Sequence, residues 1–253
     1  MNNQTSVNNG SLTSLKEKNI IITGGTTGIG RATALLLANR GANVLITGLD
    51  ENHLKDTLSD AESKGIILKG IITDMATEQG INELFAEAYK HFSRLDILIN
   101  NAALAFQGVS DGEYKDWHQI INTNITGYIA CTHHAIKRMQ QEKSGHIINV
   151  GSMSADVREK DSSVYVATKA AIQGFSESVR KEVNELGIKV TLIEPGATGT
   201  DMQPVSVPDQ QQKIEDLEML RAEDIAASIF YALSQPMRCD VVEIKVKPHL
   251  QII

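Results

Sequence analysis

Tyr165 and Lys169, in the run Tyr-Val-Ala-Thr-Lys, are the residues whose types and spacing most directly suggest chemistry. In a helix, residues four positions apart share one face and lie about 6 Å apart along the axis. A cation about 4 Å from a phenol stabilises the tyrosinate by about 4 kcal/mol, which would lower the pKa from about 10 to about 7. Ser152, thirteen positions before the tyrosine, adds a hydroxyl beside this candidate acid.

The same pair also fits an ordinary amphipathic helix, in which the tyrosine ring packs and the lysine is solvated. The five-residue motif therefore predicts catalysis only in combination with the rest of the chain.

The composition is typical of a globular protein that acts on a small molecule. The 253 residues are 42% hydrophobic and 22% charged, which suffices for one sizeable α/β domain. A net charge of -7 with scattered basic residues argues against nucleic acid and anionic lipid as partners. No apolar run is long enough to span a membrane, and residues 1–15 lack the features of a signal or transit peptide. We expect a cytoplasmic protein with a disordered polar tail over 1–15.

The two cysteines, Cys131 and Cys239, are too few and too far apart for a disulfide framework or a zinc knuckle. We expect both to be buried in a protein of a reducing compartment, and we predict no metal site.

From Lys18 onward, apolar β-type runs alternate with helical patterns, which predicts an α/β fold. The predicted strands are 19–23, 43–47, 66–72, 96–100, 146–150, 189–193 and 241–246. The predicted helices begin near Gly28, Glu51, Glu78, Glu113, Ser162 and Ala222, with Asp50 as a candidate N-cap of the second. Because most strands are continuously apolar, both sheet faces should be buried. We therefore predict a three-layer, doubly wound (Rossmann) fold with a parallel seven-stranded sheet, forming a single domain over 16–253.

The segment 197–220 interrupts this alternation, since it contains Pro204, Pro208 and three consecutive glutamines, and only its later half has a helical pattern. Long connections in compact domains are commonly lids or binding loops. We predict a substrate lid here.

The first predicted strand runs into the segment 23–30, Thr-Gly-Gly-Thr-Thr-Gly-Ile-Gly, and then into a helix. Doubly wound folds bind nucleotides at this edge of the sheet. Glycines let the backbone approach a pyrophosphate, and the helix N-terminus offers unpaired N–H groups. The alternative is a tight turn in which glycine merely permits close packing.

Taken together, these residues resemble the short-chain dehydrogenase/reductase family from about Lys16 to the C-terminus. The segment 23–30 is similar to the family's T-G-x-x-x-G-x-G turn, and Asp74 to its adenine-contacting aspartate. The segment 100–103 is similar to its N-N-A-G run, with Ala103 in place of the glycine. Pro195-Gly196 with Thr200 resembles the segment that holds the nicotinamide carboxamide.

Asn124, Ser152, Tyr165 and Lys169 match the family's catalytic tetrad. The resemblance implies that Tyr165 exchanges a proton with the substrate oxygen while a hydride moves between the substrate carbon and the nicotinamide. Lys169 would lower the tyrosine pKa and hold the cofactor's ribose, and Ser152 would position the substrate oxygen. Asn124 would bind a water of a proton relay, or alternatively bond to its own helix backbone.

The resemblance also implies a bound NAD or NADP. The implied contacts are Gly24, Thr26, Thr27, Gly28, Ile29, Gly30, Leu49, Asp50, Asp74, Met75, Asn101, Ala102, Tyr165, Lys169, Pro195, Gly196, Thr198 and Thr200. A carboxylate after the second strand favours NAD, and a basic residue there or in the turn favours NADP.

Here Gly48 and Leu49 occupy the selector positions, and Thr27 occupies the basic turn position. Asp50 either binds the ribose or caps the next helix, and Arg31 either reaches a phosphate or lies on the helix surface. We favour NAD because no obvious cation neutralises an extra phosphate.

The leading hypothesis is an oxidoreductase that interconverts a secondary alcohol and a ketone. The alternative is a catalytically silent NAD(P)-binding regulatory or interaction protein. Within the first hypothesis, the last strand and its Lys-Pro ending are loosely similar to the 3-hydroxy acid and serine branch. Arg158 or Lys160 would then hold a substrate carboxylate, although a solvated loop is the commoner meaning of the charged run 156–161.

Family members are commonly oligomers, which implies a homotetramer or a dimer formed through the helices at 113–140 and 162–186. Ala171, Phe175 and Val179 on the second of these helices face either a partner or the sheet.

Overall fold

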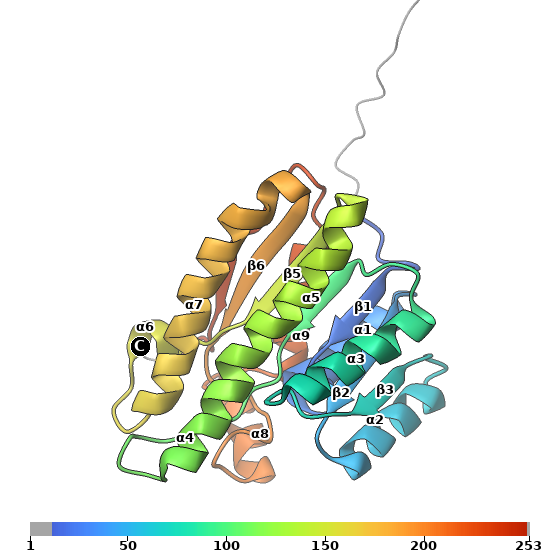
Figure 1. Cartoon of the computed structure of the whole chain (residues 1–253). Coiled ribbons are helices and arrows are strands. Elements are labelled where there is room, and N and C mark those ends of the chain that lie inside the picture. The colour runs from blue at the N-terminus through green and yellow to red at the C-terminus, as the bar shows by residue number, and fades with distance from the viewer. Residues whose placement is uncertain (1–11, 252–253) are drawn as a thin grey trace, which may run out of the picture.

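The computed structural model describes residues 12–251 and shows a three-layer α/β fold around one parallel sheet (Figure 1). Its strands are β1 (Asn19–Ile22), β2 (Asn43–Gly48), β3 (Lys69–Ile72), β4 (Ile97–Asn100), β5 (Gly145–Val150), β6 (Ile188–Pro195) and β7 (Glu243–Val246). They lie in the order β3-β2-β1-β4-β5-β6-β7, and each pairs with its neighbours in parallel. The predicted doubly wound seven-stranded sheet is confirmed.

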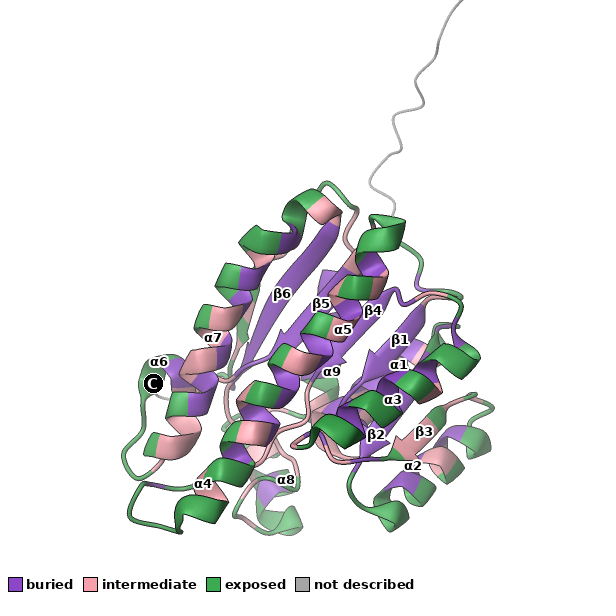
Figure 2. Cartoon of the chain, viewed as in Figure 1, coloured by how far each residue is buried: buried purple, intermediate pink, exposed green. Residues whose placement is uncertain are grey.

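Helices cover both faces of the sheet, as Figure 1 shows. The helices α1 (Gly28–Asn39), α2 (Glu51–Ser63) and α9 (Ala222–Ser234) pack on one face. The helices α3 (Glu78–His91), α5 (Gly127–Glu142) and α7 (Ser163–Val183) pack on the other. Because successive strand residues point to opposite faces, Ile20 and Ile22 join one core and Ile21 joins the other. Figure 2 shows the central strands buried and the outer helix surfaces exposed, while the edge strands β3 and β7 are only partly buried.

Several element boundaries differ from the predicted ones. β3 begins at Lys69 rather than at Ile66, because this edge strand pairs with β2 only from Leu45 opposite Lys69 onward. Ile67, in the predicted strand, is 82% exposed. The predicted helix from Glu113 is divided into α4 (Tyr114–Ile121), a π-helical turn (Asn122–Thr126) and α5.

Four side chains with predicted local roles lie in positions that decide between those roles. The Asp50 carboxylate caps α2 by accepting a hydrogen bond of 2.9 Å from the His53 N–H. Val179 of α7 is buried in the core between this helix and the sheet, so it does not face a partner. Cys131 is buried as predicted, but Cys239 is exposed, because it lies in the loop between α9 and β7 rather than in the core.

Residues 1–11 of the predicted tail lie outside the described residues. The described part contradicts a tail boundary at residue 15: the Thr13 N–H donates to the Ser234 carbonyl at 2.7 Å, and Leu15 is buried in the core. Within 12–251, none of the helices is long and apolar enough to cross a membrane.

Three short helices lie beyond the carboxyl ends of the strands, at the lower end of Figure 1. They are α4, α6 (Ser154–Val157) and α8 (Val207–Glu215), and α8 provides the helical part of the predicted lid. Every loop that carries a predicted site residue also leaves the sheet at this edge.

Candidate active site

The glycine turn joins β1 to α1 and brings two backbone segments into close contact. Gly24 has a φ of +63°, a conformation that side chains rarely adopt. A Cβ placed on Gly30 would lie 2.1 Å from the Gly24 carbonyl oxygen, so this contact requires glycine. Thr27 begins α1 in an extended conformation, and within residues 12–251 no side chain caps the helix.

These features fit the pyrophosphate of a dinucleotide. The helices α2, α3 and α8 have side-chain caps from Asp50, Thr77 and Ser206, whereas the first N–H groups of α1 remain available to an anion. The first turn of α1 itself contains no acidic residue, but the Asp201 carboxylate lies beside it, 3.5 Å from the position that a Cβ of Gly28 would take.

The segment after β4 packs directly against the glycine turn. The Asn101 side chain donates to the Thr23 and Gly24 carbonyls at 3.1 and 2.8 Å. The main-chain N–H groups of Asn101 and Ala102 donate to the Thr23 hydroxyl at 3.0 and 3.1 Å. These hydrogen bonds hold Asn101 and Ala102, two of the predicted cofactor contacts, against the glycine turn.

The segment after β6 also lies beside the glycine turn. The Pro195 carbonyl accepts from Met153, and the Gly196 N–H donates to Val246 at 2.7 Å. The Thr198 hydroxyl donates to the Gly196 carbonyl at 3.0 Å. Further along, the Thr200 methyl lies 3.0 Å from the position that a Cβ of Gly28 would take.

Sequence reasoning missed Asp201, the next residue of the lid. Its carboxylate accepts a hydrogen bond of 3.0 Å from the Thr27 hydroxyl, which joins the lid to the glycine turn. These two residues are 174 positions apart, and neither carries a local signal that would pair them.

The predicted contacts of the adenosine half lie near the ends of β2 and β3. Thr26 is buried, whereas Leu49 is 56% exposed. The Asp74 carboxylate accepts from the Ala76 N–H at 2.8 Å, and Met75 is buried in the core. Ile29, in the first turn of α1, packs against the opposite core.

Asp50 and Arg31, the two charged residues near the cofactor-selecting positions, both have protein partners. The Asp50 carboxylate is used as the α2 cap, which is one of its two predicted roles. The Arg31 guanidinium lies 3.0 Å from the Asp60 carboxylate of α2.

Tyr165 and Lys169 lie one turn apart in α7, as predicted. Lys169 is only 2% exposed, and its ammonium donates to the Val150 carbonyl at 3.0 Å. Its Nζ lies 5.6 Å from the centre of the Tyr165 ring. Ser152 follows β5, and its hydroxyl acts to lower the pKa of Tyr165. The Ser152 hydroxyl oxygen also accepts from the Ser154 N–H at 3.1 Å.

The expected fall in the pKa of Tyr165 does not occur in this arrangement. Burial raises the pKa of Tyr165, the Ser152 hydrogen bond opposes that rise, and the charge of Glu159 adds to it. Burial also lowers the pKa of Lys169 to about 8, against the pull of Glu194. The Lys169 ammonium donates to the Val150 carbonyl rather than to the phenol.

Asn124 lies in the π-helical turn and connects two other segments. Its side chain accepts from the Leu104 N–H at 2.8 Å and donates to the Leu104 carbonyl at 3.0 Å. It also donates to the Thr168 hydroxyl at 3.1 Å, beside Lys169. Its side chain therefore does not bond to its own helix backbone, and it holds the loop after β4 against α7.

In the charged run 156–161, Arg158 and Lys160 are exposed, as a solvated loop requires. The first carboxylate of the run behaves differently, because Asp156 contacts Lys245 of β7 and accepts from Gln173 at 3.0 Å.

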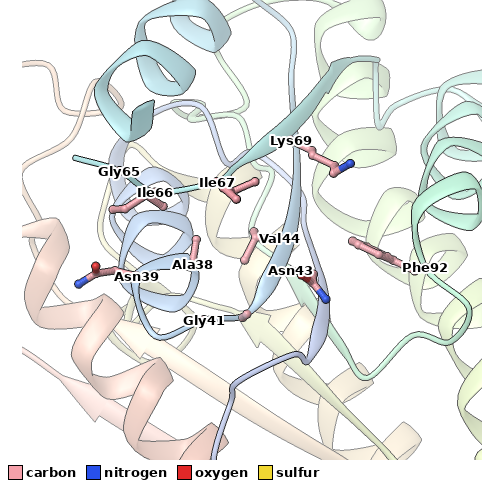
Figure 3. A pocket seen from close by; sticks show the side chains of 11 residues that line it. Ala38, Asn39, Gly41, Asn43, Val44, Gly65, Ile66, Ile67, Lys69 and Phe92 are labelled. Atoms are coloured by element: carbon pink, nitrogen blue, oxygen red, sulfur yellow. The ribbon is translucent and has the colours of Figure 1, made fainter. Parts of the chain in front are cut away.

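A separate cavity of about 280 Å³ lies at the opposite edge of the sheet (Figure 3). Its lining includes Asn43 and Lys69, the first residues of β2 and β3, and Gly41 just before β2. It is therefore remote from the carboxyl edge on which the predicted catalytic residues converge.

With this geometry established, the chain can be compared with known proteins. It matches the family model of the short chain dehydrogenases over residues 18–211. It is 33% identical over 238 residues to an uncharacterized oxidoreductase of Staphylococcus aureus (strain USA300), covering 94% of this chain and 100% of that protein. It is 31% identical over 236 residues to an uncharacterized oxidoreductase of Staphylococcus saprophyticus, covering 92% and 98%.

Two solved structures have similar folds. A short chain dehydrogenase from Burkholderia cenocepacia J2315 in complex with NADP has a TM-score of 0.81 at 26% identity, covering 93% of this chain and 98% of that one. A short-chain dehydrogenase/reductase from Serratia marcescens BCRC 10948 has a TM-score of 0.82 at 24% identity, covering 95% and 100%, and shows the fold alone. The chain belongs to the short-chain dehydrogenase family of oxidoreductases.

The glycine turn generates a prediction with an internal control. Replacing Gly30 with Ala should destabilise the protein by about 1–3 kcal/mol, because the new methyl meets a backbone carbonyl, and should weaken NADH binding by displacing the start of α1. Replacing Gly174 with Ala should stabilise it by about 0.5–1 kcal/mol, because that exposed helical position has nothing within 4 Å. Urea unfolding and NADH titration measure both variants; equal effects would contradict the close contact.

Proposed function

We propose that this protein is an NAD(P)-dependent oxidoreductase that interconverts a secondary alcohol and a ketone by hydride transfer. The observation that carries the proposal is the meeting of Ser152 and Lys169 beside Tyr165 at the edge where the glycine turn lies. The nicotinamide, when bound, supplies or accepts the hydride.

Tyr165 is the proposed general acid and base. Its hydroxyl gives a proton to the carbonyl oxygen during reduction and takes one from the alcohol during oxidation. Ser152 hydrogen-bonds the same substrate oxygen and holds it beside the phenol. The Lys169 ammonium is the proposed ligand of the cofactor's ribose and stabilises the tyrosinate once it turns from Val150 toward the phenol.

The substrate would lie under the lid 197–220, beside the loop after β4 that Asn124 holds. A 3-hydroxy acid or a serine-type substrate is the narrower candidate. The exposed Arg158 and Lys160 lie in the loop after Ser152 and are available to a carboxylate.

Replacing Tyr165 with Phe should lower turnover by about 10²–10⁴-fold, because the proton donor is lost while the ring remains. NADH affinity should be unchanged. Turnover is read from the absorbance of the reduced nicotinamide, with NAD and NADP and a panel of hydroxy acids, sugars, steroids and simple alcohols. Tyr231→Phe, at an exposed position of α9, is the matched control and should retain full activity.

Unchanged turnover in the Tyr165 variant would refute the mechanism. Cofactor binding by the unmodified protein without turnover of any compound in the panel would instead favour a regulatory or interaction protein.

We further infer a preference for NAD. Gly48 and Leu49 offer no charge to a 2′-phosphate, and Arg31 is engaged by Asp60 at 3.0 Å. Calorimetric titration should show tighter binding of NADH than of NADPH. Asp60→Asn should strengthen NADPH binding by releasing Arg31, whereas Asp56→Asn, at an exposed position of the same helix, should not. Tighter binding of NADPH to the unmodified protein would show that the inferred preference is wrong.

A further inference from the structure

A buried carboxylate lies in β6, directly before the Pro195-Gly196 segment. Glu194, the residue before Pro195 in β6, is 0% exposed. Carboxylates are rarely buried so fully without a partner, since removing the charge from water is costly. A buried Glu194 carboxylate therefore needs a compensating charge nearby.

Glu194 faces a cation across the sheet. Lys245 of β7 is its direct partner in the strand register, and Glu194 Oε2 lies 3.3 Å from Lys245 Nζ. Within residues 12–251 neither carboxylate oxygen has a partner in hydrogen-bond geometry. The two side chains are thus held mainly by opposite charge.

Lys245 is shared among several carboxylates. Its Nζ lies 2.9 Å from Glu243 and also contacts Asp156 of α6, besides Glu194. One cation cannot fully balance three anions. Burial and the nearby Glu243 carboxyl raise the pKa of Glu194 to about 7, against the pull of Lys245.

On its other side, Glu194 lies against the strand end that carries the catalytic serine. A Cβ on Gly151 would lie 3.3 Å from Glu194 Cγ and 3.5 Å from its Oε1, so the carboxylate occupies the space beside this glycine. The Val150 carbonyl, one residue earlier, is the acceptor of the Lys169 ammonium. Glu194 and Lys169 thus contact adjacent residues at the end of β5, Gly151 and Val150 respectively. The Glu194 charge favours a protonated Lys169.

We propose that Glu194 is a positioning residue for the reaction: held by Lys245, its carboxylate sets the charge that Lys169 carries beneath Tyr165. The role in turnover rests on the proposed function, but the effect on Lys169 does not. Lys245 also contacts Asp156, four residues after Ser152. The same lysine therefore connects the segment after Ser152 to Glu194.

The charged groups that act on Glu194 come from the elements around it. β7 contributes Lys245 and Glu243. The Glu194 charge in turn acts on Lys169 of α7. α6 contributes Asp156 through the shared lysine, while Gly151, the residue after β5, is uncharged.

The test is the titration of Lys169 in Glu194→Gln, which keeps the shape and removes the charge. Lysines carrying ¹³C at Cε are followed by NMR against pH, and the Lys169 signal is assigned by its loss in Lys169→Met. The unmodified protein should titrate at about 8. Glu194→Gln should titrate on the order of one pH unit lower, because an attractive charge is gone. The alkaline limit of activity should fall by the same amount.

Two further variants separate this role from a purely structural one. Lys245→Met leaves Glu194 without its cation and favours its neutral form, so it should shift Lys169 in the same direction as Glu194→Gln. Glu243→Gln removes an exposed carboxylate from the same lysine and should leave Lys169 unshifted or titrating slightly higher.

An unmoved Lys169 titration in both Glu194→Gln and Lys245→Met, or an equal downward shift in Glu243→Gln, would overturn the assignment. Because the titration needs no substrate, it remains decisive even if the unmodified protein turns over none of the alcohols or ketones, a result that would count against the proposed function alone.

Discussion

The burial of one lysine ammonium is the constraint on which the rest of the site depends. Lys169 is 2% exposed, and an ammonium removed from water needs an acceptor and a compensating charge. The Val150 carbonyl provides the acceptor at 3.0 Å, and it also accepts from the Tyr128 hydroxyl of α5 at 3.1 Å. Glu194 provides the charge. The end of β5, two helices and the neighbouring strand are therefore tied to one amine.

The parallel sheet makes this arrangement possible. Neighbouring parallel strands end at the same edge, so the loops after β1, β4, β5 and β6 emerge side by side. Asn101 then bonds the loop after β4 to Gly24, Met153 bonds the loop after β5 to Pro195, and Asp201 bonds the lid to Thr27. The glycine turn and the loops beside it are thereby held together by side-chain and backbone hydrogen bonds.

The sequence predicts the sheet because its strands have local signatures, and the tetrad is what the resemblance to the short-chain dehydrogenases implies. The continuous apolar runs identify all seven strands, and Asp50 is placed correctly as a cap because its preference acts within one turn. The sequence does not predict where β3 begins, since pairing with β2 decides that, nor the π-helical turn that aims Asn124 at Leu104. The contacts of Glu194 with Lys245 and of Thr27 with Asp201 join distant segments and have no local signal. The effect of burial on Tyr165 is equally invisible, because burial is set by the finished fold.

The most direct test is the stability of Lys169→Met compared with the unmodified protein at pH 7 and pH 10. Burial lowers the pKa of Lys169 from 10.5 to about 8, which corresponds to about 3 kcal/mol of lost stability. Below pH 8 both the folded and the unfolded chain bind the proton and this cost is complete; it fades as the pH rises toward 10.5, where the folded lysine is already neutral. Urea unfolding should therefore show Lys169→Met to be more stable than the unmodified protein at pH 7, by up to about 3 kcal/mol, with most of the difference gone at pH 10. A difference that is the same at both pH values, or a less stable variant at pH 7, would contradict a strained buried amine at the centre of the site.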